Sequence, residues 1–334
     1  MAVQIQLVVG GVALLVVGLV VGGVANLSRE TGEKKLGTSS KTTECSRSLS
    51  ESDGFYCMPD DEWNERVDAV RRRAEKQCGR DQECCKDGPK TTLPNWYRDC
   101  FEPEWSCVVE RIGRTGDGGK WICEVDKILR AARKRNEPCL IYSFGSNGDY
   151  SFETKAHERM KECEIFTFDP TVDLRWRPPP EFIHFVPWGL GPKDGVNASD
   201  VFGKKATPGS MMYRLRTAMK LLGHENREID ILKIDIEGSE YDAFNDFFED
   251  DFLPFRQIQI ELHKPQRSGR LHAQLRRHGY VITHKEPNYA WFATLQELAF
   301  LRLSRNFFKD VVPDPHVIPL ANQLDDWQIK STRG

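Results

Sequence analysis

Apolar and polar positions alternate with two different periods along most of the chain. Short apolar runs typical of buried strands cover 140–144, 164–168, 182–186, 229–234, 257–262, 280–283 and 298–303. Between them, apolar residues recur at helical spacing over 152–160, 212–222, 241–248 and 271–275. Strands that alternate with helices favour a doubly wound, mainly parallel sheet, so we predict an α/β fold for residues 136–305.

The residues before this region have a different composition and hydrophobic pattern. Residues 7–25 form an unbroken apolar run, nearly long enough as a helix to span about 30 Å of hydrocarbon. We predict a transmembrane signal-anchor over 1–27, which contacts the membrane through 7–25. A signal peptide cleaved after Ala25 is the alternative, since Gly23 and Ala25 have the small side chains of a cleavage site.

Residues 28–53 contain almost no large apolar side chain and are predicted to form a flexible stalk. A segment rich in cysteine and tryptophan follows over 54–135, and a C-terminal tail occupies 306–334. Within the cysteine-rich segment, Asp60 can cap a helix whose apolar positions recur every three or four residues. Those positions are Trp63, Val67, Val70 and Ala74.

Two features of the sequence disagree about the side of the membrane. Ten cysteines, seven of them between residues 57 and 123 without a zinc-like spacing, indicate disulfides and an oxidising compartment. The basic residues after the apolar run would instead keep the body cytosolic. We favour a lumenal body, or a secreted one if cleavage occurs near Ala25, and expect a glycan on Asn197 in its Asn-Ala-Ser sequon.

One disulfide can be predicted from strand positions. Cys139 and Cys163 each lie six residues before a candidate site residue, at the starts of two strands expected to be adjacent. Neighbouring parallel strands are about 4.8 Å apart, within the usual range of Cα separations in disulfides. We therefore predict that the two cysteines are close enough to bond.

Charge argues against one class of partner. The formal net charge is −3 and charged residues make up 29% of the chain. Proteins that bind nucleic acids usually present a basic face, and the sequence shows no such excess. No nucleic-acid partner is expected.

The candidate chemistry lies just after the predicted strands. In doubly wound sheets, ligands bind outside the carboxyl ends of the strands. Each of these residues could merely make a turn or cap a helix, but their convergence on one crevice favours a ligand site. The residues are Gly145, Ser146, Asn147 and Gly148 after the first strand, Asp169 after the second, Asp235 and Glu237 after the fourth, and Glu261 and His263 after the fifth.

Five of these segments together carry a family resemblance. They read I-Y-S-F-G-S-N-G-D-Y-S-F-E from 141, I-F-T-F-D-P-T from 165, P-W-G-L-G from 187, I-D-I-L-K-I-D-I-E-G-S-E from 229 and Q-I-Q-I-E-L-H from 257. With G-D-G-G-K-W-I-C-E at 116–124, they resemble the S-adenosylmethionine-dependent methyltransferase family of methyltransferase-like protein 24, related to the FkbM-type O-methyltransferases. The resemblance implies a seven-stranded Rossmann-like sheet with an antiparallel last strand.

The same resemblance implies roles for individual residues. Gly145 and the turn that follows it would face the methionine part of S-adenosylmethionine, and Asp169 would hold the ribose hydroxyls. Trp188 and Gly189 would lie near the adenine, and Asp235 beside the sulfonium. Three prolines at 178–180 depart from the pattern, because they leave no room for the usual helix between the second and third strands.

Methyl transfer to a hydroxyl needs alignment and removal of a proton. The candidate bases are Asp235, Glu237, Glu261 and His263, of which a histidine that titrates near neutral pH suits the task best. The same four residues could instead hold a divalent metal. We expect O-methylation of a sugar, glycan or other small polar acceptor.

Other functions stay open from the sequence. A membrane-anchored glycosyltransferase could use Asp235 and Glu237 as a metal-binding acidic pair. A methyltransferase-fold module without catalysis is another alternative. A nicotinamide-dependent oxidoreductase is disfavoured because no G-x-G-x-x-G motif is present.

Overall fold

The computed structural model describes residues 45–78, 100–288 and 295–308. The predicted membrane segment over 7–25, the stalk up to residue 44 and the tail beyond residue 308 lie outside the described residues. Within the described part of the chain, no helix combines the length and the apolar character needed to cross a membrane.

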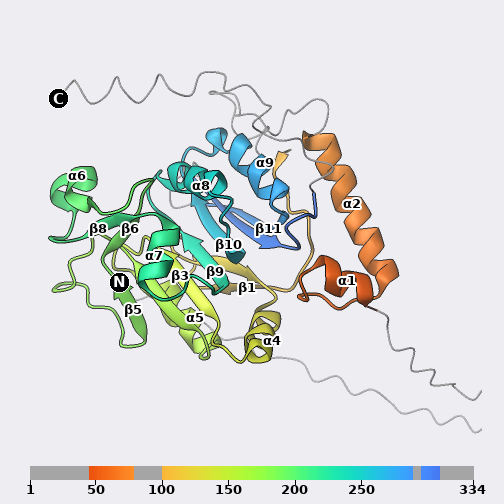
Figure 1. The fold of residues 1–334 in the computed structure, drawn as a ribbon, viewed down its shortest axis with the longest axis horizontal. Coiled ribbons are helices and arrows are strands. Elements are labelled where there is room, and N and C mark those ends of the chain that lie inside the picture. The colour runs from red at the N-terminus through yellow and green to blue at the C-terminus, as the bar shows by residue number, and fades with distance from the viewer. Residues whose placement is uncertain (1–44, 79–99, 289–294, 309–334) are drawn as a thin grey trace, which may run out of the picture. The chain divides into compact units, whose positions relative to one another are not determined.

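Helices and strands alternate along the described chain (Figure 1). The helices are α1 (Ser46–Glu51), α2 (Asp60–Cys78), α4 (Val125–Arg135), α5 (Ser151–Arg159), α6 (Ala198–Phe202), α7 (Leu215–Leu221), α8 (Glu240–Glu249) and α9 (Gly269–Arg277), with short 3₁₀ turns at Gly203–Lys205 and Pro265–Arg267. The strands are β1 (Val109–Ile112), β2 (Lys120–Cys123), β3 (Leu140–Phe144), β4 (Glu164–Phe168), β5 (Ile183–Val186), β6 (Trp188–Leu190), β7 (Val196–Asn197), β8 (Met211–Tyr213), β9 (Ile229–Ile234), β10 (Phe255–Leu262), β11 (Tyr280–Pro287) and β12 (Gln296–Arg302).

Seven strands form the main sheet in the order β11-β12-β10-β9-β3-β4-β5. The strands from β10 through β9, β3 and β4 to β5 pair in parallel, whereas β12 lies antiparallel between β10 and β11. The mixed seven-stranded α/β sheet and its antiparallel last strand are therefore confirmed. Its central strands are buried on both faces, which explains their nearly continuous apolar runs.

Each face of the sheet packs against a different set of elements. Because side chains alternate along a strand, Tyr142 points to one face and Ile141 to the other. The Tyr142 face packs on apolar residues of α7, α8 and α9, such as Phe244. The Ile141 face packs on α4, α5 and α2, and its cluster includes Ile128 and Trp63.

The cysteine-rich segment shares this second core. On α2, the predicted apolar positions Trp63, Val67, Val70 and Ala74 are all buried in it. One buried amide links the β1–β2 hairpin to β10: the Cys123 N–H donates to Gln257 Oε1 at 3.0 Å, and Gln257 Nε2 donates to the Cys123 carbonyl. The sequence boundary drawn at residue 135 is therefore not a boundary between two cores.

The end of the predicted stalk is folded, which corrects that prediction for residues 45–53. A disulfide joins Cys45 to Cys57, and α1 lies between them.

The role expected for Asp60 also changes. Asp60 is the first residue of α2, and its carboxylate accepts hydrogen bonds from the Arg47 N–H and the Ser46 hydroxyl, at the start of α1. It therefore satisfies donors of α1, the helix before its own.

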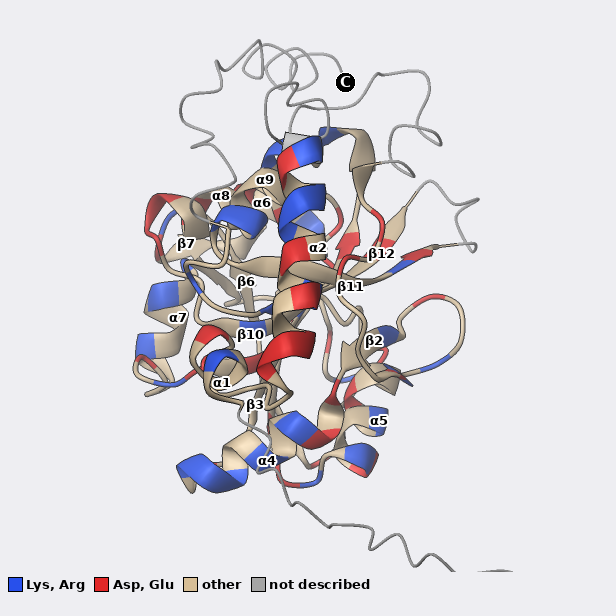
Figure 2. Cartoon of the chain, turned by 90° about the vertical axis from the view of Figure 1, so that its right-hand side faces the viewer, with Lys and Arg blue, Asp and Glu red and all other residues tan. Residues whose placement is uncertain are grey.

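Charges follow the helix dipoles in the N-terminal part (Figure 2). The first turn of α2 carries Asp60, Asp61 and Glu62, and its last turn carries Lys76. The last turn of α4 carries basic residues at 133–135. Acidic groups near a helix N-terminus and basic groups near its C-terminus stabilise the helix.

The connections around β5 differ partly from expectation. No helix forms between β4 and β5, as the prolines at 178–180 predicted. A small sheet in the order β6-β8-β7 was not predicted. It takes Met212 into β8, so α7 begins only at Leu215. Such short strands leave little periodicity in a sequence.

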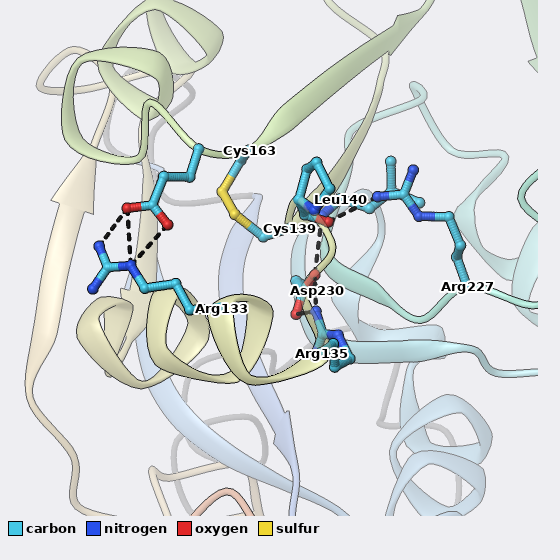
Figure 3. The surroundings of a disulfide bond; sticks show 9 residues. Arg133, Arg135, Cys139, Leu140, Cys163, Arg227 and Asp230 are labelled. Atoms are coloured by element: carbon cyan, nitrogen blue, oxygen red, sulfur yellow. Dashed lines mark hydrogen bonds and ion pairs between the residues drawn. A yellow bond between two sulfur atoms is a disulfide. The ribbon is translucent and has the colours of Figure 1, made fainter.

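A disulfide fastens the beginnings of β3 and β4, where Cys139 and Cys163 have a Cα separation of 4.4 Å (Figure 3). This confirms the predicted contact. Beside it, Arg135 Nη2 donates to both carboxylate oxygens of Asp230 at 2.9 Å, and Asp230 also accepts from the Leu140 N–H. The amino ends of three adjacent strands, β4, β3 and β9, are thus fixed together.

Replacing both cysteines, Cys139→Ser with Cys163→Ser, should lower the free energy of unfolding by about 3 kcal/mol. The bond closes a loop of 24 residues, and opening it restores conformational entropy to the unfolded chain. Urea unfolding of both proteins without reductant measures the difference. Alkylation and mass spectrometry of the native protein should find neither thiol free; free thiols at both positions would contradict the bond.

Candidate functional site

The turn after β3 is pinned between its two neighbouring strands. The Gly145 N–H donates to the Phe168 carbonyl at 2.9 Å, and the Asp235 N–H donates to the Phe144 carbonyl at 3.1 Å. Gly145 has a φ of +80°, and a Cβ there would lie 1.7 Å from the Asp235 carbonyl oxygen. Only glycine allows this approach, which sets the turn directly against the end of β9.

Asp169 holds this turn. Its Oδ2 accepts from the Ser146 and Asn147 N–H groups at 3.0 and 2.8 Å. Its Oδ1 accepts from the N–H and the hydroxyl of Thr171 at 2.8 and 2.7 Å. A carboxylate offers about four acceptor positions, and here the protein fills four. The predicted hydrogen bonds from a ribose diol would have to displace these donors, so the geometry makes Asp169 a positioning residue.

An irregular segment covers the turn in place of the missing helix. Arg177 donates to the Asn147 carbonyl, and the Tyr150 hydroxyl donates to the Arg177 carbonyl at 3.0 Å. A Cβ on Gly148 would lie 2.2 Å from Arg177 Cδ. The second glycine of the turn therefore makes room for this arginine.

Trp188 and Gly189 lie beyond the end of β5, in β6 of the small sheet. The Trp188 ring contacts Tyr213 edge to face at a centroid distance of 4.9 Å. A Cβ on Gly189 would lie 2.6 Å from Met212 Sδ, so this glycine serves packing inside the small sheet. Contact of these two residues with adenine stays a prediction.

Carboxyl and ammonium groups gather where β9, β10, β12 and β2 meet. We call this group the Asp235 cluster; it consists of Asp117, Lys120, Lys233, Asp235, Glu261 and Glu297. At its centre Lys120, only 1% exposed, places Nζ 2.6 Å from Glu297 Oε1 and 3.7 Å from Asp235 Oδ2. Burial alone would lower the pKa of Lys120, but Glu297, Asp235 and Glu261 raise it above its usual value, so it stays protonated.

Asp235 and Glu261 differ in protonation. Burial, and then the neighbouring Asp235 and Glu297, raise the pKa of Glu261 to about 8. Burial acts in the same direction on Asp235, but Lys120 and Lys233 outweigh it and hold the pKa of that carboxyl below its usual value. At neutral pH the two groups therefore share one proton, which Glu261 carries, and Asp235 is the carboxylate.

Glu237 and His263 lie apart from this pair. The Glu237 side chain is 87% exposed and places Oε2 3.4 Å from His263 Nε2. His263 Nδ1 lies 3.0 Å from Glu240, whose carboxylate also accepts from the Ile236 and Gly238 N–H groups. Burial would lower the pKa of His263, but the Glu240 hydrogen bond and charge raise it to about 9.

This corrects the preference for His263 as the base. A protonated imidazole cannot accept a proton at neutral pH, and the sequence could not show that Glu240 would stand beside it. The structure thus brings Asp235 and Glu261 together, as predicted, and separates both from the exposed carboxylate of Glu237.

A family model described as a methyltransferase domain matches residues 46–302, most of the chain. The chain belongs to this methyltransferase family. No curated protein matches it significantly. Among solved structures, a candidate RNA methyltransferase of Pyrococcus horikoshii is similar at 13% identity, over 53% of this chain and 82% of that one, with a TM-score of 0.25. So low a score carries no argument about the substrate.

Sequence reasoning missed several residues of this methyltransferase's site. Lys233 donates to the Gly145 carbonyl, and Asn288 Nδ2 donates to Glu261 Oε1 at 2.9 Å. Lys120 and Glu297 complete the buried ion pair. Their signal was a charged residue inside an apolar strand, K-W-I-C at 120–123 and Q-E-L-A-F at 296–300. Such residues are rarely buried unless they are paired.

Asp169→Ala should lower the free energy of unfolding by about 1–3 kcal/mol, because it leaves the Ser146 and Asn147 N–H groups without their acceptor. Asp173→Ala is the matched control: its carboxylate pairs with Arg175 at the surface, and its loss should leave the free energy of unfolding nearly unchanged. Urea unfolding measures both. Equal losses would remove the positioning role of Asp169.

Proposed function

We propose that the protein is an S-adenosylmethionine-dependent methyltransferase that methylates a hydroxyl oxygen on a sugar, glycan or other small polar acceptor. Membership of the methyltransferase family supports methyl transfer. The observation that carries the proposal is the close contact between the Gly145 turn and the end of β9. Because of this contact, the turn that we propose for cofactor binding lies next to Asp235, the proposed base.

The residues at the strand ends fit the proposed cofactor. S-adenosylmethionine supplies a methyl group on a positively charged sulfur when it is bound. The Asp235 cluster has more carboxyl than ammonium groups, and such a field attracts a sulfonium. The Gly145–Gly148 turn would hold the methionine part, and Trp188 and Gly189 would lie near the adenine.

Asp235 is the group that an acceptor can reach. Its side chain is 16% exposed, whereas Glu261 is a buried residue that is only 2% exposed as a whole. Because Asp235 is ionised, it can take the proton of an acceptor hydroxyl as the oxygen attacks the methyl group. Lys120, whose Nζ lies 3.7 Å from Asp235 Oδ2, keeps this carboxylate oriented. An amine that is already unprotonated would need no such base, which favours a hydroxyl.

The glycosyltransferase alternative depended on Asp235 and Glu237 as a metal-binding pair. The Asp235 carboxylate forms an ion pair with the buried Lys120, whereas the Glu237 carboxylate contacts His263 at the surface. That pair is therefore not assembled, and the alternative loses the feature that favoured it.

We also propose that the body folds in an oxidising compartment, whether anchored or secreted. Disulfides join Cys45 to Cys57, Cys107 to Cys123 and Cys139 to Cys163. Structural disulfides persist in secretory compartments. Alkylation of protein taken directly from cells reports this state.

The purified chain should bind S-adenosylhomocysteine in calorimetry, and Gly145→Ala should weaken binding by at least about tenfold, because the added Cβ displaces the end of β9. Gly191→Ala is the control, since its Cβ would meet nothing closer than 3.4 Å. Binding of a nucleotide sugar instead would support the glycosyltransferase. Binding of neither ligand would support a module without catalysis.

With labelled S-adenosylmethionine and a panel of glycan, catechol and protein acceptors, label should enter a hydroxyl. Asp235→Asn should lower kcat by about 10²-fold or more, because it removes the base. His263→Gln should lower it far less, because a protonated imidazole takes no proton. Label only in protein Lys or Arg, or full activity in Asp235→Asn, would refute the proposed acceptor and base.

A further inference from the structure

We propose that Asp117, Asp235 and Glu261 bind one divalent cation of the Mg²⁺ or Mn²⁺ type, which orients the acceptor hydroxyl beside the methyl group. The cation site itself follows from the structure. Its task in catalysis rests on the proposed function.

The three carboxylates converge from separate parts of the chain. Asp117 lies in the turn between β1 and β2, Asp235 directly follows β9, and Glu261 is near the end of β10. One oxygen of each lies within 4.8 Å of the others. Opposite ligands of Mg²⁺ are about 4.2 Å apart, so at most a small inward shift of the carboxylates completes the site. A set made only of oxygen ligands suits Mg²⁺ or Mn²⁺ better than zinc.

A buried acceptor without a partner points to the same place. Glu297 is 5% exposed and lies directly opposite Glu261 in the β10–β12 register. Its Oε1 holds Lys120, but its Oε2 has no hydrogen-bond partner. A buried carboxylate oxygen without a donor is costly. A cation, or a water bound to it, would satisfy this oxygen.

Charge balance gives the valence of the ion. The cluster contains four carboxyl groups and two ammonium groups, those of Asp117, Asp235, Glu261, Glu297, Lys120 and Lys233. A carboxyl that ligates a metal is deprotonated, so an ion at this site would displace the proton that Glu261 carries without it. The carboxylates would then exceed the ammonium groups by two charges, which one divalent ion balances. His263 faces Glu237 and Glu240, carboxylates outside the cluster.

Asn288 already bridges two of the proposed ligands. Its Nδ2 donates to Glu261 Oε1 at 2.9 Å and lies 3.4 Å from Asp117 Oδ1. Rotation of the amide by 180° would present its oxygen to an ion at that point. The proposed ligand set thus replaces Glu237 and His263, which the sequence suggested, with Asp117 and the Asn288 amide.

The proton, the electrons and the leaving group of the proposed methyl transfer can each be followed. Asp117, Asp235 and Glu261 would hold the ion, which would lower the pKa of a hydroxyl bound to it. The Asp235 carboxylate would take the proton of the acceptor hydroxyl. An electron pair of the acceptor oxygen forms the bond to the methyl carbon, and the electrons of the breaking carbon–sulfur bond remain on sulfur. The leaving thioether is neutral.

The test measures Mn²⁺ binding to the full chain after treatment with EDTA, by the loss of the free-ion signal in electron paramagnetic resonance. We expect one ion per chain, displaced by Mg²⁺. Asp117→Asn should weaken binding by at least about tenfold, since it removes a charged ligand from an exposed turn without disturbing the sheet. Asp126→Asn, at a surface pair with Arg159, is the control and should bind as the wild type does.

Calorimetry with S-adenosylhomocysteine on the same samples separates the two proposals. Cofactor binding without Mn²⁺ binding overturns the cation site and leaves the methyltransferase proposal intact. Mn²⁺ binding that Asp117→Asn weakens, without cofactor binding, supports the site and refutes the proposed function. Equal Mn²⁺ affinity in Asp117→Asn and wild type overturns this ligand set.

Discussion

The buried ammonium of Lys120 is the interaction on which the candidate site depends. It lies among carboxylates from β9, β10 and β12, which would repel one another at this distance without a cation. Its own backbone belongs to β2, which does not pair with the main sheet. The ion pair with Glu297 therefore stabilises both the docking of the hairpin and the convergence of the acidic side chains at the strand ends.

The N-terminal segment consequently belongs to the site as much as to the fold. The Gln257 amide matches both backbone groups of Cys123, and the Cys107–Cys123 disulfide restrains the same strand. This arrangement places the preceding turn, with Asp117, over the ends of β9 and β10. The family match, which begins at residue 46, fits a domain in which the N-terminal elements pack on the main sheet.

The carboxylates at the strand ends have two different kinds of partner. Asp169 accepts hydrogen bonds from the backbone N–H groups of Ser146 and Asn147, and Glu240 Oε1 accepts from those of Ile236 and Gly238 and contacts His263, so both carboxylates fix the shape of the loops after β3 and β9. Asp235 and Glu261 interact instead with lysines and with each other. The first pair of carboxylates supplies a rigid frame, and the second pair is the one that the proposed methyl transfer would use.

The sequence alone determined the features that depend on neighbours along the chain. The apolar runs predicted β3, β4, β9 and β10 closely, because burial on both faces demands them. The position of Cys139 and Cys163 at the starts of adjacent strands predicted their contact, since parallel register is regular. Prolines at 178–180 predicted that no helix forms between β4 and β5, because each proline disfavours a helix at its own position in the chain.

Only the tertiary structure decided how the charged groups are used. Lys120 and Glu297 are 177 residues apart, and their contact depends on how a hairpin docks on a sheet. The pKa of His263 depends on Glu240, and the occupancy of Asp169 depends on the path of the turn it holds. Protonation and hydrogen bonding are set by distance and burial, which side chains acquire only when remote segments pack together.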